Sequence, residues 1–168
     1  MANTQQPPHN FKVRVASRDD GPAVMELVAS VLQEYGLKSD PVSTDADLAD
    51  IEASYQSMGG WFQVVESQDG RIVGSVGLHP EGEESCELRK MYLLPEARGF
   101  GLGRFLLEEA LEKAQQLGFR RVTLETAKVL REAKTLYERY GFQQYEPAHL
   151  SCRCDEAYEL WFPEPVTT

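Results

Sequence analysis

The 168-residue sequence predicts an α+β fold with a central, twisted, mostly antiparallel sheet that is flanked by about four helices. The turn Asp69-Gly70 lies between two apolar segments and indicates a β-hairpin, so the strands on either side of it are antiparallel. Residues 86–125 then read as a strand, a long helix and another strand, and a crossover of this kind joins two parallel strands. The composition agrees, because 42% hydrophobic and 26% charged residues are typical of a globular domain.

The spacing of the apolar residues places the individual elements. Alternating apolar and polar residues indicate half-buried strands, whereas spacings of three and four residues, as at Val24, Leu27 and Val28, indicate amphipathic helices. Strands are expected over residues 11–16, 61–66, 71–78, 86–94, 121–125, 142–145 and 156–162. Helices are expected over residues 19–35, 46–58, 104–117 and 130–140. We expect a single domain over residues 11–168 after a disordered lead over residues 1–10.

Charge and cysteine usage argue against several classes of protein. The formal net charge of -10 at pH 7 would repel a phosphate backbone, so nucleic acid is not an expected partner. No apolar run reaches the about 18 residues of a membrane span, and the polar N-terminus lacks the apolar region of a secretory signal. The 3 cysteines do not suit a secreted disulfide framework, so we expect a reducing, cytoplasmic environment. His149, Cys152 and Cys154 lack the ligand number and spacing of a zinc site, so no metal is expected.

A glycine-rich turn between a strand and a helix is the most informative motif. Gly99, Gly101 and Gly103 alternate with other residues, between Arg98 and Arg104. The start of a helix has N–H groups without partners and a partial positive charge, and glycine lets a ligand approach that backbone closely. The turn therefore suits an anion such as a pyrophosphate, with the flanking arginines adding charge-assisted hydrogen bonds.

Three other interpretations of this turn compete. The triphosphate-binding pattern GxxxxGK[ST] is absent, so hydrolysis of a nucleoside triphosphate lacks its lysine. The dinucleotide pattern GxGxxG is not matched, since the spacing is GxGxG, although Glu125 lies about where the ribose-binding acid of that fold would be. A glycine-rich connection without any ligand stays open on this motif alone.

Two motifs in chain order carry a resemblance to a known family. The first, Arg/Gln-x-x-Gly-x-Gly/Ala, is matched by Arg98, Gly101 and Gly103. The second, Ala-x-x-Leu-Tyr-x-x-x-Gly-Phe, is matched by Ala133, Leu136, Tyr137, Gly141 and Phe142. Residues 87–142 thus resemble the GNAT superfamily of acyl-CoA-dependent N-acyltransferases. The resemblance implies that the strand before the turn splays from its parallel neighbour.

The resemblance also implies where acetyl-CoA binds. The pyrophosphate of the coenzyme is expected on a group of residues that spans the turn and the helix start, namely Arg98, Gly99, Phe100, Gly101, Leu102, Gly103 and Arg104. The pantetheine arm is expected to pair, as an extra strand would, with the backbone at Met91 and Leu93. One of those N–H groups would also polarise the thioester carbonyl. Many members carry an asparagine that contacts the pantetheine arm where this chain has Leu130, so the chain departs from the family pattern at that position.

Two catalytic roles follow from the same resemblance. Tyr137 occupies the position of a tyrosine that protonates the departing thiolate, and Glu87 the position of a general base for the amine. The alternative for Tyr137 is a core aromatic that packs on Leu136 and Phe142. The alternative for Glu87 is a sheet-surface charge that pairs with Arg89 or Arg121.

The expected function is transfer of an acetyl group from acetyl-CoA to a primary amine of a small molecule or peptide. The amine attacks the thioester directly in a ternary complex. The alternative is a non-catalytic module that binds or senses acyl-CoA. The sequence leaves the acceptor open, and it leaves the oligomeric state open as well, since members of the superfamily are often homodimers through their last strands.

Overall fold

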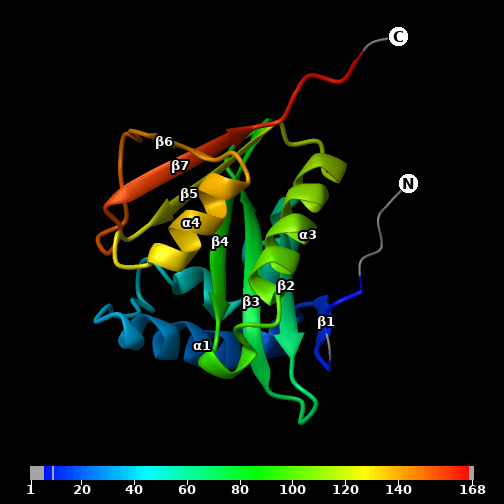
Figure 1. The fold of residues 1–168 in the computed structure, drawn as a ribbon, viewed down its shortest axis with the longest axis vertical. Coiled ribbons are helices and arrows are strands. Elements are labelled where there is room, and N and C mark those ends of the chain that lie inside the picture. Colours follow the sequence, from blue (N-terminus) through cyan, green and yellow to red (C-terminus); the bar gives the residue numbers. More distant parts are fainter. Residues whose placement is uncertain (1–5, 9, 167–168) are drawn as a thin grey trace.

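The computed structural model describes residues 6–8 and 10–166 and confirms the predicted α+β fold (Figure 1). Of the lead predicted over residues 1–10, residues 1–5 and 9 lie outside the described residues, as do residues 167–168. The strands are β1 (Lys12–Val15), β2 (Trp61–Glu66), β3 (Ile72–Pro80), β4 (Ser85–Leu93), β5 (Arg121–Thr126), β6 (Gln143–Tyr145) and β7 (Glu156–Trp161). They form a 7-stranded sheet in the order β1-β2-β3-β4-β5-β7-β6.

The helices follow the predicted order with two local differences. They are α1 (Gly21–Glu34), α2 (Ile51–Ser54), α3 (Leu102–Gln116) and α4 (Arg131–Arg139), with short 3-10 turns at Arg18–Asp20, Ala46–Ala49, Gln56–Met58 and Pro95–Ala97. The helix predicted over residues 46–58 is interrupted, because Asp50 has an extended backbone and its side chain accepts the Ala53 N–H at 3.1 Å, which starts a new helix. The helix predicted from Arg104 begins at Leu102 instead, because Gly101, with φ 82°, ends the preceding turn.

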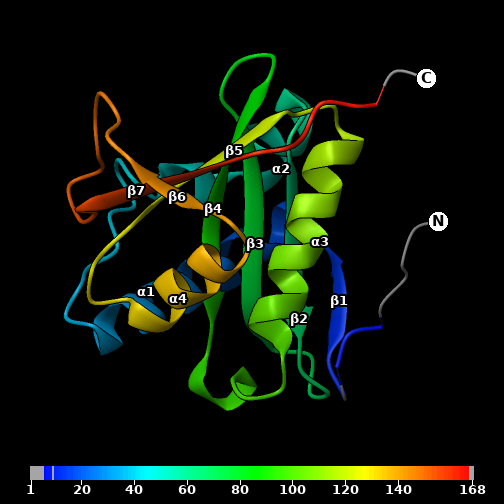
Figure 2. The same ribbon diagram turned by 45° about the horizontal axis from the view of Figure 1, so that its top comes forward.

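β4 and β5 form the parallel pair that the crossover predicted, and they separate soon after they meet. Every other pair of neighbouring strands in the sheet is antiparallel. The parallel ladder joins Ser85–Glu87 to Arg121–Thr123 and goes no further, although β4 continues to Leu93. Figure 2 shows the two strands diverging on the side where α4 lies. The predicted splay of the parallel pair is therefore present.

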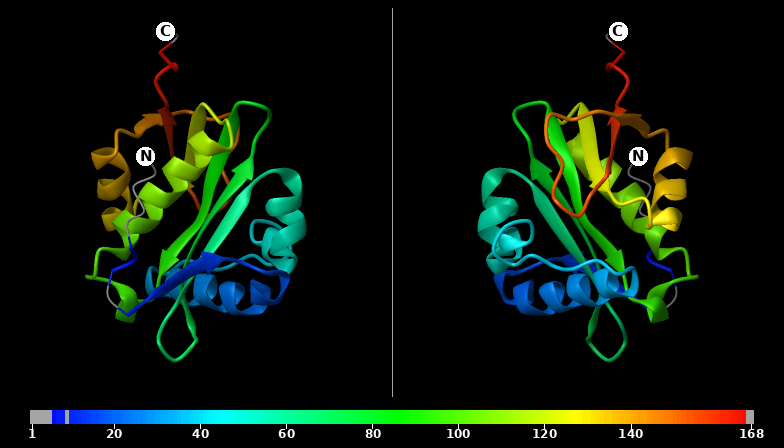
Figure 3. Two further views of the ribbon diagram at one scale, coloured as in Figure 1. Left: turned by 90° about the vertical axis from the view of Figure 1, so that its right-hand side faces the viewer. Right: turned by 90° about the vertical axis from the view of Figure 1, so that its left-hand side faces the viewer.

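Helices cover both faces of the sheet (Figure 3). α3 and α4 pack on one face, where Leu106 of α3 lies in a core cluster with Leu78 and Leu124 of the sheet. α1 and α2 pack on the other, where Val28 of α1 and Phe62 of β2 share a second cluster. Since both faces are covered, the strands that carry the site are held in a rigid frame.

A β-bulge interrupts β4 just beyond the parallel ladder. Ser75 pairs with Tyr92 and Gly77 with Arg89, so two residues of β4, Lys90 and Met91, lie opposite one residue of β3. Lys90 has φ 55° and is the only non-glycine residue with positive φ in the described part of the chain.

Candidate active site

A cleft of about 740 Å³ opens where β4 and β5 separate. Its walls come from β4, the turn before α3 and the start of that helix, the end of β5 with α4, the end of α1 at Val31 and Tyr35, and the two segments around Ser43–Thr44 and Leu150–Cys154. Of the residues predicted to form the site, those that line the cleft are Glu87, Met91, Leu93, Arg98, Gly103 and Tyr137. The other predicted residues, which lie next to the cleft in the turn and the first residues of α3, are Gly99, Phe100, Gly101, Leu102 and Arg104.

The start of α3 has the properties expected of an anion site. The first hydrogen bond of the helix runs from the backbone N–H of Phe105 to the Gly101 carbonyl, at 3.0 Å. The N–H groups of the helix residues before Phe105 therefore have no partner within the helix. Gly101 caps this end without a side chain, and Gly99 shares its left-handed conformation with φ 83°. The exposed N–H groups and the helix dipole together favour a phosphate at this end.

Gly103 shows that the wall leaves room for a ligand. Its φ is not positive, so the backbone itself does not require glycine. A Cβ at this position would meet only the Leu136 and Leu93 side chains, both at 3.8 Å, which is an ordinary contact distance. The protein would therefore tolerate a methyl group here, and the space that glycine leaves is part of the cleft.

The side chains of Arg98 and Arg104, the two arginines of the turn, differ in how firmly other residues hold them. Arg98 bonds to the Glu34 carboxylate of α1 at 2.9 and 3.0 Å and to the Leu93 carbonyl at 3.1 and 2.9 Å. It therefore ties the turn to the end of β4. Arg104 extends into solvent with its side chain 70% exposed and pairs with Glu108 one helical turn later. Its partners are the Glu108 carboxylate and the Tyr140 hydroxyl, and because the guanidinium is largely solvated these bonds hold it weakly, so Arg104 can turn toward an anion at the helix start.

Met91 and Leu93 lie on a stretch of β4 that no longer pairs with β5. The ladder between the two strands ends at Glu87, and both residues line the cleft beyond that point. An unpaired strand edge offers N–H and C=O groups to any extended chain that lies along it. This edge leads from the start of α3 toward Glu87, so a long ligand bound at one end would reach the other.

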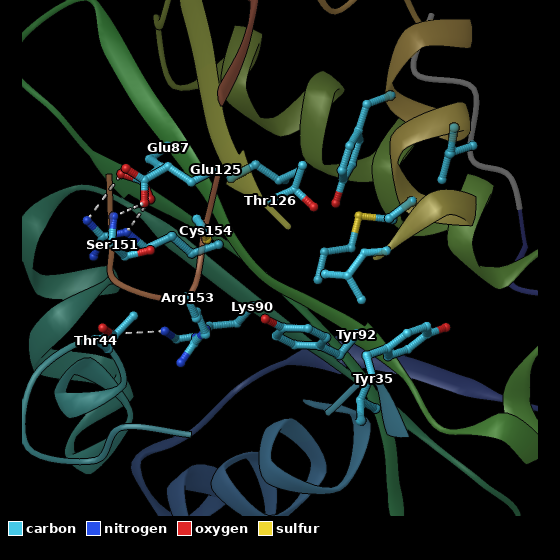
Figure 4. A pocket seen from close by; sticks show the side chains of 18 of the residues that line it. Tyr35, Thr44, Glu87, Lys90, Tyr92, Glu125, Thr126, Ser151, Arg153 and Cys154 are labelled. Carbon is cyan, nitrogen blue, oxygen red and sulfur yellow. Dashed lines mark hydrogen bonds and ion pairs between the residues drawn. The ribbon is translucent and has the colours of Figure 1, made fainter. Parts of the chain in front are cut away.

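Glu87 lies at the inner end of this edge and pairs with Arg89. The Arg89 Nε is 3.1 Å from a carboxylate oxygen of Glu87. Desolvation by burial raises the pKa of Glu87, and Arg89 only partly opposes the rise. Glu125, at the end of β5, adds a second negative charge that raises the same pKa, and both carboxylates face the cleft (Figure 4). Of the two pairings considered for Glu87, Arg89 is the one observed, while Arg121 pairs with Glu159 instead.

Tyr137 is buried at the other wall of the cleft. Its side chain is only 6% exposed, and its ring lies 5.8 Å from that of Phe142. Burial, together with the nearby Tyr92 and Cys154, raises the pKa of Tyr137 above its ordinary value, so the phenol keeps its proton at neutral pH. Tyr137 is thus both packed in the core and exposed to the cleft at its edge. Leu130, the departure from the family pattern, also lines the cleft.

A buried cluster of charges beside β4 was missed by sequence reasoning. Asp45 is completely buried, and its carboxylate contacts Lys90 Nζ at 2.7 Å and both terminal nitrogens of Arg153 at 2.7 Å. The three residues come from distant parts of the chain, so no local spacing links them. The one available signal was Lys90 itself, a lysine in strand alternation with the apolar Cys86 and Leu88.

The structure gives no support to a metal site. Within the described residues, no group of three or more His, Cys, Asp or Glu side chains could hold a metal ion. Cys152 and Cys154 are free thiols that line the cleft. Over the same residues, no helix has the length and apolar character needed to cross a membrane.

Known proteins are similar to this chain in sequence and in fold. Residues 25–142 match the model of the acetyltransferase (GNAT) family. The Escherichia coli (strain K12) protein named uncharacterized N-acetyltransferase YjgM is 39% identical over 163 residues, which cover 91% of this chain and 97% of that protein. An acetyltransferase of the GNAT family from Staphylococcus aureus Mu50 superposes with a TM-score of 0.82 at 22% identity, covering 89% of this chain and 97% of the other. The protein yncA from Salmonella typhimurium, described with its cofactor acetyl-CoA, superposes with a TM-score of 0.72 at 20% identity. The superposition covers 95% of this chain and 98% of yncA.

The fold, in which the start of α3 lies beside a splayed pair of parallel strands, is shared with solved acetyltransferases. The chain belongs to the acetyltransferase (GNAT) family, as the match to its family model over residues 25–142 and the 39% identical relative show.

Proposed function

We propose that the protein transfers an acetyl group from acetyl-CoA to a primary amine of a small molecule or peptide. One observation carries the proposal: a single cleft joins the start of α3, the unpaired edge of β4, Glu87 and Tyr137. The first two suit the two ends of a long anionic coenzyme, and the last two supply a base and an acid. The match of yncA, which is described with acetyl-CoA, adds support for this co-substrate.

The coenzyme would be held mostly by backbone groups. The N–H groups at the start of α3, with Gly103 leaving space beside them, suit its pyrophosphate. The edge of β4 at Met91 and Leu93, which does not pair with β5, suits the carbonyl groups of the pantetheine arm through its N–H groups, because the Leu93 carbonyl already accepts from Arg98. Bound this way, acetyl-CoA supplies an activated thioester, and an N–H group of β4 is in position to polarise its carbonyl.

Glu87 is the proposed base. A protonated amine is not a nucleophile, so a carboxylate near the acceptor must take its proton before or during attack. Burial raises the pKa of Glu87, which makes it a stronger base than an exposed glutamate. The Arg89 guanidinium, 3.1 Å away, fixes the carboxylate in place and keeps it ionised for this role.

Tyr137 is the proposed acid. Its hydroxyl stays protonated at neutral pH because burial raises its pKa, so the proton is available for the departing thiolate. Packing against Phe142 limits the positions that the ring can take, and this holds the hydroxyl at the cleft wall. A packed tyrosine is therefore compatible with the catalytic role.

The acceptor is proposed to be cationic before it reacts. Glu87 and Glu125 both face the cleft, and the chain as a whole carries a net charge of -10. Arg89 pairs with Glu87, so Glu125 is the carboxylate that would attract a positively charged amine to this end. The direct attack of this amine on the thioester needs both substrates bound at once.

The experiment is a screen of amines with acetyl-CoA that follows release of the free thiol, accompanied by calorimetry with coenzyme A. We expect binding of coenzyme A and amine-dependent thiol release by the unmodified protein. Binding of coenzyme A without thiol release for any amine would favour the non-catalytic acyl-CoA-binding module instead. Absence of coenzyme binding would overturn both.

A further inference from the structure

We propose that Lys90, Asp45 and Arg153 form a charge lock that holds the β4 bulge in the shape needed to polarise the thioester. In this role Lys90 and Asp45 are positioning residues: they act through the backbone of β4 and do not touch the reacting atoms. The inference rests on the proposed function, because it concerns the same end of the cleft.

The bulge places Lys90 in a conformation that its side chain disfavours. With φ 55°, Lys90 lies in the left-handed region, where a Cβ crowds the backbone and where glycine is the usual residue. The bulge lies three residues beyond Glu87, at the free edge of β4. A non-glycine residue keeps such a conformation only where its surroundings hold it there.

The surroundings hold Lys90 at both ends. At the backbone end, the hydroxyl of the fully buried Ser75 donates to the Lys90 carbonyl at 2.6 Å. At the side-chain end, Nζ donates to the Thr44 carbonyl at 3.0 Å and to the Asp45 carboxylate at 2.7 Å. The side chain is itself only 5% exposed, so these bonds are not shared with solvent. Two fixed ends leave the peptide groups between Lys90 and Met91 little freedom to rotate.

Other hydrogen bonds fix the position of the Asp45 carboxylate that binds Lys90. This carboxylate accepts two bonds from Arg153 at 2.7 Å, and one from the Asp40 N–H at 2.8 Å. The lock therefore joins three parts of the cleft wall: the segment after α1, the bulge of β4 and the segment before β7. Figure 4 shows Lys90 and Arg153 side by side on this wall.

A buried ion pair of this kind is better explained by geometry than by stability. Removing charges from water costs so much that buried pairs often add little net stability, whereas they do fix the position of the groups they join. A bulge re-aims the backbone of its strand. Here the bulge sets the direction of the N–H group of Met91, which directly follows Lys90. This N–H group lies in the part of β4 that is proposed to contact the thioester carbonyl. A hydrogen-bond donor to a developing oxyanion is effective only when its direction is fixed in advance.

Two substitutions at the same position separate this role from a purely structural one. Lys90→Met and Lys90→Gly both remove the ammonium group and leave Asp45 paired with Arg153 alone. Methionine keeps the steric conflict of a side chain at φ 55°, but glycine adopts this φ without cost. We expect Lys90→Met to lower kcat about 10- to 100-fold and Lys90→Gly to stay within about 3-fold of the unmodified protein. Lys134→Met, which removes the ion pair between Lys134 and Glu156 outside the cleft, is the matched control.

A second readout does not depend on turnover. Calorimetry compares the Kd of acetyl-CoA with that of coenzyme A, which lacks the carbonyl, so the ratio reports the hydrogen bond to that group. We expect Lys90→Met to raise the ratio of the acetyl-CoA Kd to the coenzyme A Kd and Lys90→Gly to leave it unchanged, with the Kd of coenzyme A unchanged in both.

The outcomes separate the lock from the proposed function. An equal rise of the Kd ratio and an equal fall of kcat in the two variants, or larger effects for glycine, would overturn the lock, since a structural role predicts that the larger cavity is worse. If the unmodified protein transfers acetyl groups to no amine, the proposed function fails, and the affinity ratio still decides the lock.

Discussion

Gly103 at the start of α3 lies opposite Leu93 at the end of β4, and a Cβ on Gly103 would be 3.8 Å from Leu93 Cδ1. Both residues line the cleft, so the helix start and the strand edge face each other across it at this point.

Gly103→Glu tests whether the coenzyme binds at the start of α3. The variant places a carboxylate beside the N–H groups of the helix start, where it would repel a pyrophosphate, so the Kd of coenzyme A should rise at least about 10-fold. Gly103→Ala should leave that Kd within about 3-fold, because the family motif accepts alanine at this position and the methyl group meets only ordinary contacts. Gln115→Glu, on the exposed side of α3, is the charge-matched control and should leave the affinity unchanged. Unchanged affinity in Gly103→Glu would place the coenzyme elsewhere.

Tyr137→Phe tests the proposed acid. Loss of the hydroxyl should lower kcat about 10- to 100-fold, because the thiolate then leaves without a proton donor. The ring and its packing on Phe142 are kept, so the Kd of coenzyme A and the melting temperature should be nearly unchanged. Tyr145→Phe removes a tyrosine hydroxyl outside the cleft and should remain fully active. Full activity in Tyr137→Phe would leave Tyr137 with a packing role only.

The pH profile tests Glu87. A base works when it is deprotonated, so kcat/KM should fall as the pH drops through the pKa of Glu87. Since burial raises that pKa above the ordinary glutamate value of 4.5, this fall should begin at a higher pH than it would for an exposed glutamate. Glu87→Gln should lower kcat by about 10²-fold or more and abolish the acidic limb of the profile. Glu84→Gln, in the exposed loop before β4, is the control. An acidic limb that persists in Glu87→Gln belongs to another group.

Asp45→Asn tests the cost of the buried charge cluster. The variant leaves Lys90 and Arg153 buried without their carboxylate, which should lower the free energy of unfolding at pH 7 by about 3–5 kcal/mol. Burial by itself would raise the pKa of Asp45, but hydrogen bonds from Arg153, Lys90 and the Asp40 N–H outweigh it and hold that pKa well below its ordinary value of 3.8.

The sign of the pH dependence follows from that shift. A lowered pKa in the folded state stabilises the fold above pH 3.8, and this contribution is lost as the pH falls further. Urea unfolding at several pH values gives the free energy of unfolding of the unmodified protein and of Asp45→Asn. The difference between these two free energies should become smaller below about pH 4. Asp19→Asn, at an exposed position, should show no such difference. A difference that stays constant with pH would contradict the assignment to the charge of Asp45.

Local chemistry made much of the fold and part of the site predictable. The turn of residues 98–104 joins a strand to a helix because its glycines permit left-handed backbone, which the φ of Gly99 and Gly101 confirms. The alternating and helical spacings placed the sheet and its helices to within a few residues. The spacings failed at residues 46–58, where they predicted one continuous helix. There the side chain of Asp50 caps the start of a new helix.

The remainder of the site depends on contacts between distant segments. Arg153 and Asp45 are 108 residues apart, and Lys90 and Asp45 are 45 apart, so neither pair leaves a periodic signal. The end of the β4–β5 ladder at Glu87 is likewise decided by how the two strands pack, and not by either strand alone.

By itself, the sequence determined the order of the elements and the glycine turn that starts α3, because backbone preference and apolar spacing act over a few residues. The tertiary structure alone decided which charges are buried together and where the edge of β4 becomes free. The reason is that burial of a charge is tolerated only when its partner arrives from elsewhere in the chain, and that pairing exists only once the sheet has formed.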